Sequence, residues 1–359
     1  MKGSVSETIR SKIKAWYRKN RRDLPWRKTS DPYHIWVSEI ILQQTRVSQG
    51  ISHYLKFVSR FPDLKTLAAA TEEDVLKTWQ GMGYYTRARN LYKTAVLITN
   101  SYNSIFPGTP EELVKLPGIG SYTAAAIASI AYRYPVPTID ANVIRIIARL
   151  YGMQQDIHSA GLKKKIETLT MELLDQENPG EFNQAMMDFG SLQCTPGIPG
   201  CSFCTLNQYC KAHLTGMEDK IPMRKEKKKL QHRYFHYLVL TDHGHVWLHK
   251  RTGNDIWHSL YEFPLAEMPA GKQPDAESWY KATGISDIQP EKISKTYRHT
   301  LSHQMIHATF YQATIPPGNK QPGDELVRVP VQSIGTYPLP VLIARYLADS
   351  GTADYRQKG

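Results

Sequence analysis

Two carboxylates stand in segments where a solvated charge is not expected. Glu39 lies in "HIWVSEIILQQT", where apolar neighbours leave little of a helix facing water. Burial of this kind raises the pKa of a glutamate, as a general acid requires. Asp140, in "PVPTIDANVIRIIARLYG", precedes an apolar helical run, where helix N–H groups would cap it and favour its ionised form. One protonated and one ionised carboxylate can cleave a glycosidic bond, whereas plain capping by Asp140 and a solvated helix edge for Glu39 are the structural alternatives.

All four cysteines lie in one loop, "CTPGIPGCSFCTLNQYC", with the spacing C-x6-C-x2-C-x5-C. Four thiolates suit zinc or an iron–sulfur cluster. Zinc ribbons favour two separated C-x2-C pairs, and here Cys201 and Cys204 form one such pair. We therefore expect a [4Fe-4S] cluster, with zinc as the alternative. Its expected ligands are Cys194, Cys201, Cys204 and Cys210.

The segment "LPGIGSYTAAAIASIAY" predicts a tight turn at Gly118 and Gly120, followed by a helix from Ser121. Glycines permit positive φ and close approach of a ligand, and the N–H groups of the following helix end can bind a phosphate. Such a site would contact the DNA backbone without reading its sequence. A plain turn between two helices is the alternative.

Charge favours an anionic partner. Lys plus Arg is 45 and Asp plus Glu is 33, which gives a formal net charge of +12. Nucleic acid is the natural counterpart, although a basic protein with no such role has the same charge. The N-terminal segment has no apolar core of signal-peptide length, and no stretch approaches the ~20 apolar residues of a spanning helix. We expect a cytoplasmic protein without a membrane partner, in a compartment that keeps thiols reduced.

Two regions are expected to position these groups. Residues 1–216 show helical spacing of apolar residues, with a capping box at Thr71 and Asp74 and a cap at Thr109. A basic segment, 217–232, has the composition of a linker. Residues 233–359 predict an α+β domain that begins with two strands joined at Asp242–Gly244.

The hairpin "LPGIGSYTA", the segment "TIDANVIR" and the cysteine loop together resemble the helix-hairpin-helix superfamily of DNA glycosylases, which includes endonuclease III. Within it, "LPWR", "WVSEIILQQT", "GMGYYTRARNL" and "NQAMMDFG" are similar to MutY-type adenine DNA glycosylases. The resemblance covers essentially the whole chain. It implies a mostly α catalytic region with a six-helix barrel lobe and an iron–sulfur lobe, and an α+β Nudix-like C-terminal domain.

The activity that the resemblance implies is hydrolysis of the N-glycosidic bond of adenine mispaired with 8-oxoguanine or guanine in duplex DNA, by a monomer. Bifunctional relatives of endonuclease III carry a strand-cleaving lysine just after the hairpin, and Tyr122 stands at that position here. Base removal without strand cleavage is therefore expected. The alternatives are an endonuclease III-like glycosylase/lyase for oxidised pyrimidines and a non-catalytic DNA-binding protein, which would need neither Glu39 nor Asp140.

The resemblance also implies roles for individual residues. Glu39 would protonate adenine N7 and then activate water, and Asp140 would stabilise the sugar cation. The C-terminal domain lacks the R-E-x-x-E-E core of a working Nudix hydrolase, so it would recognise 8-oxoguanine without hydrolysing a nucleotide, and its inspecting loop has a leucine where relatives commonly have phenylalanine. The remaining implied residues are Tyr122 and Asn142 in support of catalysis; Trp26, Arg27, Leu42 and Gln184 in the adenine pocket; Gln44, Thr45, Met82 and Tyr84 at the opened duplex; and Leu301, Ser302 and His303 in the inspecting loop.

Overall fold

The computed structural model describes residues 2–155, 159–223, 230–292, 294–315 and 321–351. Contacts divide the chain into two units, Met1–Ala69 with Asn90–Glu226, and Ala70–Arg89 with Lys227–Gly359. The second unit thus takes in Ala70–Arg89, twenty residues that lie inside the range 1–216 predicted for the first region. Part of the predicted linker, residues 224–229, lies outside the described residues.

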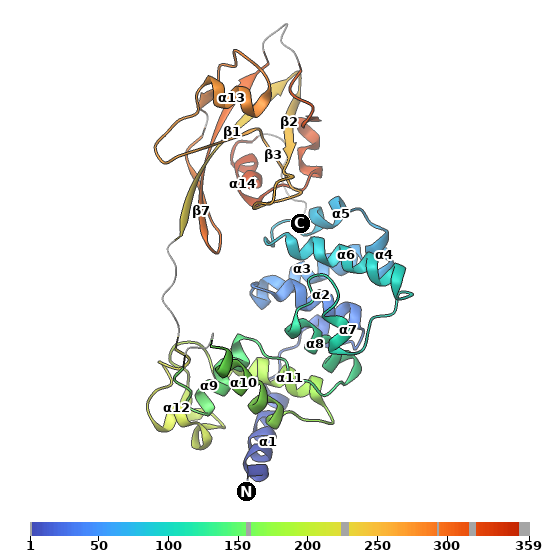
Figure 1. The fold of residues 1–359 in the computed structure, drawn as a ribbon, viewed down its shortest axis with the longest axis vertical. Helices are drawn as coiled ribbons and strands as arrows, with labels where there is room; N and C mark the ends of the chain where they lie inside the picture. The colour runs from blue at the N-terminus through green and yellow to red at the C-terminus, as the bar shows by residue number, and fades with distance from the viewer. Residues whose placement is uncertain (1, 156–158, 224–229, 293, 316–320, 352–359) are drawn as a thin grey trace. The chain divides into compact units, whose positions relative to one another are not determined.

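The regular elements of the described N-terminal region are all helical, as predicted (Figure 1). Its local signals act as expected, because Thr71 and Asp74 form the capping box and the Thr109 and Asp140 side chains cap the helices that follow them. The elements are α1 (Lys2–Asn20), η1 (Pro25–Arg27), α2 (Pro32–Leu42), α3 (Val47–Arg60), α4 (Leu64–Ala69), α5 (Glu72–Thr78), α6 (Thr86–Ser101), α7 (Pro110–Leu113), α8 (Ser121–Tyr132), α9 (Ala141–Leu150), α10 (Ala160–Leu173), α11 (Pro179–Asp188), η2 (Phe189–Gln193), η3 (Cys201–Phe203), η4 (Asn207–Tyr209) and α12 (Lys211–Leu214).

Within the first unit, α1 packs against helices that lie far from it in the sequence. Ile9, Ile13 and Tyr17 share one hydrophobic core with apolar side chains of α9, α10 and α11. Three cysteines of the loop, Cys194, Cys204 and Cys210, border this core. The start of the chain therefore helps to build the lobe that carries the cysteine loop. In the other lobe, α2 packs against α3 and α8.

The C-terminal part is a mixed sheet with helices, as the α+β prediction requires (Figure 1). The longest ladder joins β1 to β7 in parallel, from Gln231 opposite Gln304 to Thr241 opposite Thr314. The turn after β1 has positive φ at His243 and Gly244, which matches the twist of a two-residue hairpin. The elements are β1 (Gln231–Asp242), β2 (His245–Lys250), β3 (Tyr261–Glu262), β4 (Leu265–Met268), α13 (Ala276–Thr283), β5 (Glu291–Lys292), β6 (Tyr297–Thr300), β7 (Gln304–Thr314), β8 (Leu326–Pro330), η5 (Val331–Thr336) and α14 (Val341–Asp349).

Both faces of this sheet are covered. Successive side chains of a strand point to opposite faces, so β1 contributes to two cores. Phe235, Tyr237 and Val239 pack with residues of α14, whereas Leu238 and Leu240 pack with Trp279 of α13 and its neighbours. This explains why β1 is apolar in an almost continuous run. Among the described residues, no helix is long and apolar enough to cross a bilayer.

Candidate active site

Glu39 lies on α2, nearly all of whose side chains are buried, and it is itself only 6% exposed. It borders a small cavity in the first unit. The same cavity is lined by Tyr122 and by all four residues that were predicted to hold adenine. Its full lining is Arg22, Leu24, Trp26, Arg27, Ile35, Ser38, Glu39, Leu42, Val47, Tyr122, Ile130, Gln184 and Met187.

The electrostatic surroundings keep a proton on Glu39 near neutral pH. Burial raises the pKa of Glu39 to about 7, and the negative charge of Asp140 adds to the rise. The Tyr122 hydroxyl and the positive charge of Arg27 act in the opposite direction on the pKa. The predicted direction for Glu39 is thus confirmed.

Asp140 sits at the N-terminus of α9, where one carboxylate oxygen accepts the Val143 N–H at 2.8 Å and the other accepts the Asn142 amide at 2.6 Å. These donors and Arg145 lower the pKa of Asp140, but burial outweighs them, so the net change is upward. Both carboxylates therefore shift in the same direction. The expectation that capping favours the ionised form of Asp140 was wrong in the direction of its pKa, because the desolvation of Asp140 exceeds the effect of its hydrogen bonds.

Asn142 connects Asp140 to the cysteine loop. Its side-chain oxygen accepts from Arg145 at 2.9 Å, and Arg145 also donates to the carbonyl oxygens of Gly190 and Cys194. Gly190 lies in η2, a π-helical turn, and a Cβ at this position would lie 2.5 Å from the Asn142 Cβ. A glycine is required there for η2 to approach α9.

The predicted hairpin turn precedes α8, which begins at Ser121. Gly118 has φ +75°, and a Cβ there would lie 2.6 Å from the Asn90 Cβ, so this position requires glycine on two counts. Gly120 has φ −85°, which any residue can adopt, so the freedom of glycine to take positive φ is used at Gly118.

Two of the residues predicted to act at the opened duplex have an unusual backbone. Gln44 is exposed with φ 57°, and Tyr84 is 47% exposed with φ 48°. Positive φ is costly for residues other than glycine and is often found at functional sites. Thr45 is partly buried and its hydroxyl donates to the Gln43 carbonyl, while Met82 is only 7% exposed.

The predicted inspecting loop is the turn between β6 and β7. The Leu301 N–H donates to the Gln304 carbonyl at 2.8 Å, and the Leu301 side chain packs against the sheet core. Ser302 and His303 are exposed at the tip. Within the second unit, the hydroxyls of Ser302 and Tyr84 form a hydrogen bond. Two residues that were predicted to contact DNA independently are therefore partners in the free protein.

All four cysteines line one cavity in the first unit, although the loop between them is irregular. A single zinc ion would hold its sulfurs roughly 3.8 Å apart, given a Zn–S bond of ~2.3 Å and tetrahedral geometry. In the described chain, no three of these sulfurs lie within 4.8 Å of one another. Burial raises the pKa of Cys201 and of Cys204 to about 11, and the neighbouring thiols add to it, so a bound cation is needed to make them thiolates. Four cysteine side chains around one cavity are a donor set that a metal centre can use.

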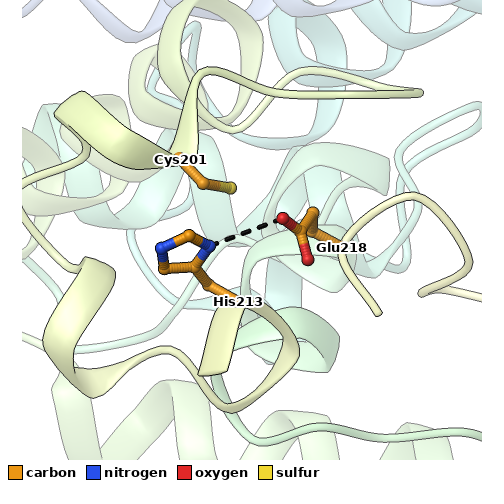
Figure 2. Close-up of side chains that lie close together, drawn as sticks. All are labelled: Cys201, His213 and Glu218. Atoms are coloured by element: carbon orange, nitrogen blue, oxygen red, sulfur yellow. Dashed lines mark hydrogen bonds and ion pairs between the residues drawn. The ribbon is translucent and has the colours of Figure 1, made fainter. Parts of the chain in front are cut away.

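One group of three ligand-type side chains does meet that distance, namely Cys201, His213 and Glu218 (Figure 2). His213 Nδ1 lies 3.4 Å from a Glu218 carboxylate oxygen, and both side chains border the cysteine cavity. His213 and Glu218 lie beside Cys201, one of the predicted ligands, and line the same cavity.

Sequence reasoning missed three charged residues that hold these parts together. Arg149 donates to the carbonyl oxygens of Thr195, Gly197 and Ile221 and so fixes the cysteine loop. Arg145 links that loop to Asn142, and Asp188 binds Arg27. Arginine at two positions four apart in an apolar helix was the available signal for Arg145 and Arg149.

Two protein-family models match the chain. Residues 37–176 match a family model described as "HhH-GPD superfamily base excision DNA repair protein", and residues 235–349 match a NUDIX domain model. The chain is similar to the solved structure of a thermostable thymine-DNA glycosylase, with a TM-score of 0.54 and 27% identity over 58% of this chain and 97% of that one. An endonuclease III–DNA covalent intermediate shares the fold, with a TM-score of 0.52 and 21% identity over 60% of this chain and 99% of that one. The helical fold with its hairpin and buried acid is that of a helix-hairpin-helix DNA glycosylase, and the second region is Nudix-like.

Curated relatives narrow this class. An adenine DNA glycosylase of Buchnera aphidicola subsp. Acyrthosiphon pisum is 36% identical over 293 residues, which is 81% of this chain and 82% of that protein. The human adenine DNA glycosylase is 38% identical over 213 residues, which is 57% of this chain and 39% of that protein. The chain belongs to the adenine DNA glycosylase family of base-excision repair.

Proposed function

We propose that this protein acts as a monomer on duplex DNA and removes adenine paired with 8-oxoguanine or guanine. The cavity beside Glu39 carries the proposal. It brings a buried acid whose pKa is raised to about 7 together with apolar, aromatic and amide side chains suited to a flat purine. Gln184 suits adenine because a side-chain amide can both donate and accept hydrogen bonds, as an edge of adenine with an amino group beside a ring nitrogen requires.

The reaction starts when adenine leaves the base stack and enters this cavity, at a cost of a few kcal/mol that is lower for a mismatch. Glu39 donates its proton to N7 while the bond from C1′ to N9 breaks, and the bonding electron pair stays with adenine. The sugar becomes an oxocarbenium ion, which the ionised Asp140 stabilises. Water then adds to C1′ and gives a proton to the Glu39 carboxylate, which restores the acid. The products are free adenine and an abasic site.

Other residues position the substrate. The turn at Gly118 offers backbone N–H groups to a phosphate, and Gln44 and Tyr84 enter the space that the extruded adenine leaves. Their positive φ angles support this role, because the backbone already holds both side chains out from regular structure. Asn142 and Tyr122 hold the two carboxylates in place. Since Tyr122 has no amine, no Schiff base forms there and the DNA strand stays intact.

The four cysteines would hold a [4Fe-4S] cluster. When bound, such a group contributes folding energy to its loop and serves no step of the base removal above. Arg149 and Arg145 connect the loop to α9 and, through Asn142, to Asp140. An ordered cysteine loop therefore helps to hold Asp140 in position through these hydrogen bonds.

The proposed activity is tested by single-turnover base release from three duplexes. They carry adenine opposite 8-oxoguanine, adenine opposite guanine, and an oxidised pyrimidine opposite its normal partner. Release is expected from the first two, with abasic sites and uncut strands as products. Release of the pyrimidine, or strand cleavage without added base, would favour an endonuclease III-like glycosylase/lyase instead.

The turn between β6 and β7 is proposed to distinguish 8-oxoguanine from guanine. The exposed Ser302 hydroxyl donates and accepts, so it can meet the O8 or the N7–H of 8-oxoguanine, and His303 can add a phosphate or base contact. Leu301 packs against the core and replaces an aromatic ring, which reduces stacking on a neighbouring base.

A Ser302→Ala, His303→Ala double variant tests this role. Its rate ratio for 8-oxoguanine over guanine should narrow by a factor that corresponds to ~1–3 kcal/mol, while slow release from the guanine mismatch persists. An unchanged ratio would place the discrimination elsewhere, around Gln44, Thr45 and Met82.

A further inference from the structure

Asp188, the last residue of α11, is a fully buried carboxylate between two guanidinium groups. Arg27 donates to it through both terminal nitrogens, at 2.7 Å and 2.9 Å. Arg22 donates through Nε at 2.8 Å, through a second side-chain nitrogen and through its backbone N–H. Arg27 also donates to the Arg22 carbonyl oxygen at 3.2 Å. One carboxylate thus fixes the direction of both arginines.

Arg27 lines the cavity that contains Glu39, whereas Asp188 does not. Charged and titratable groups reach Glu39 from three elements that surround α2, namely Arg27 from η1, Tyr122 from α8 and Asp140 from the start of α9. The remaining neighbour, α3, contributes the apolar Val47 to the cavity. Of the three groups, Arg27 is the one with positive charge, and it lowers the pKa of Glu39. Burial is the largest influence on this pKa, and a closer approach of the Arg27 guanidinium would lower it further.

A buried guanidinium that has lost its partner is strongly destabilising, so it turns toward another acid within reach. If Asp188 lost its charge, Glu39 would be such an acid for Arg27. An Arg27–Glu39 ion pair would hold Glu39 ionised and fill the space for the base. Two bonds from Arg27 to Asp188 prevent this, and the hydrogen bonds also hold the pKa of Asp188 down despite its burial.

We propose that Asp188 is a positioning residue for adenine release, which holds Arg27 as a wall of the cavity and away from Glu39, so that Glu39 keeps the proton it must donate. This role of Asp188 rests on the proposed function, in which Glu39 donates its proton to adenine.

The test compares Asp188→Asn with wild type in single-turnover adenine release between pH 5 and pH 9. In wild type the rate should fall as Glu39 ionises above about pH 7. In Asp188→Asn this fall should move at least one pH unit lower, so that the rate drops about eightfold or more at pH 7.5 and only a few-fold at pH 5. A loss of equal size at every pH would mean that Asp188 has only a structural role.

Asp175→Asn is the matched control. Asp175 is also a buried carboxylate with a cationic partner, Lys14, and it accepts from backbone N–H groups just before α11, but it does not border the Glu39 cavity. Its pH profile should match that of wild type. A shift of the same size in this control would overturn the specific role of Asp188.

Two further measurements decide the matter if Asp188→Asn does not fold or if wild type releases no adenine. Arg27→Gln removes the positive charge, so the ionisation of Glu39 should move to higher pH; no movement would overturn the proposal. Carbon-13 NMR of glutamate-labelled protein follows that ionisation without DNA, and the Glu39 signal is identified by its loss in Glu39→Gln. Wild type that releases no adenine would refute the proposed function. A lower pH midpoint for the ionisation of Glu39 in Asp188→Asn, measured by NMR, would still support the role of Asp188 in holding Arg27 away from Glu39.

Discussion

At the scale of single residues, the buried Glu39 has opposite effects on activity and stability. Glu39→Gln keeps the size of the side chain but removes the transferable proton, so adenine release should fall by ~10²–10⁴-fold or more. Binding to the mismatched duplex should persist. Single-turnover release and equilibrium binding of the same variant measure both quantities, and release within a few-fold of wild type would remove Glu39 from the role of acid.

The pKa of Glu39 gives the stability effect its sign. Burial raises this pKa from 4.5 to about 7, so the folded state holds the proton more tightly than the unfolded state. The corresponding stability is fully present below pH 4.5 and is lost as the pH rises through 7. Glu39→Gln avoids that loss, and its unfolding midpoint should exceed that of wild type at pH 8 but not at pH 4.5. Thermal unfolding at both pH values checks this, and a variant that is less stable at pH 8 would contradict it.

Asp140 is both a helix cap and the proposed partner of the sugar cation. Asp140→Asn keeps an oxygen for the Val143 N–H, because asparagine caps a helix about as well as aspartate. It removes the negative charge, so adenine release should collapse while the melting temperature changes little. A parallel loss of both would indicate that capping is the main role of Asp140.

At the scale of elements, the cysteine loop is predicted to depend on its metal. Cys201→Ser should remove one ligand and with it the broad brown absorption of a [4Fe-4S] centre, and duplex binding should weaken as the loop loses order. Iron, sulfide and zinc analysis of wild type is the control. One zinc per chain without iron or sulfide would contradict the cluster.

Contacts within one element could be predicted from the sequence, whereas contacts between distant elements could not. The capping box at Thr71 and the cap at Asp140 depend on residues three positions apart, so the local pattern contains both partners. Burial of Glu39 followed from its apolar neighbours. The pair of Arg27 and Asp188 joins η1 to α11, and the two residues are 161 positions apart in the sequence. A buried charge can be suspected from sequence, but its partner depends on how distant elements pack.

The rise in the Asp140 pKa illustrates the same limit. Its hydrogen-bond donors were visible in the sequence because they belong to its own helix. The burial that outweighs them comes from the packing of the folded chain around it. The hydrogen-bond donors to Asp140 could therefore be predicted from the sequence, while the effect of burial on its pKa could not.

At the scale of the whole molecule, the net charge of +12 should govern affinity for DNA. Each phosphate that Lys or Arg neutralises releases bound counterions, so the logarithm of the binding constant falls linearly with the logarithm of salt concentration. Contacts to two or more phosphates predict at least a tenfold loss of affinity between about 50 and 200 mM salt. Fluorescence anisotropy with a labelled duplex measures the slope, and an affinity independent of salt would contradict an electrostatic interface.

The parallel ladder between β1 and β7 has a consequence for the order of folding. β1 can form its hairpin with β2 as soon as the turn at Gly244 closes, but its parallel partner begins at Gln304. Contacts between residues so distant in sequence require a large loop to close before they are formed, and such contacts slow folding. During synthesis, the helices that hold Glu39 and Asp140 leave the ribosome before β7 exists. The sheet that carries Ser302 and His303 should therefore be completed last, after most of the first unit has had time to fold.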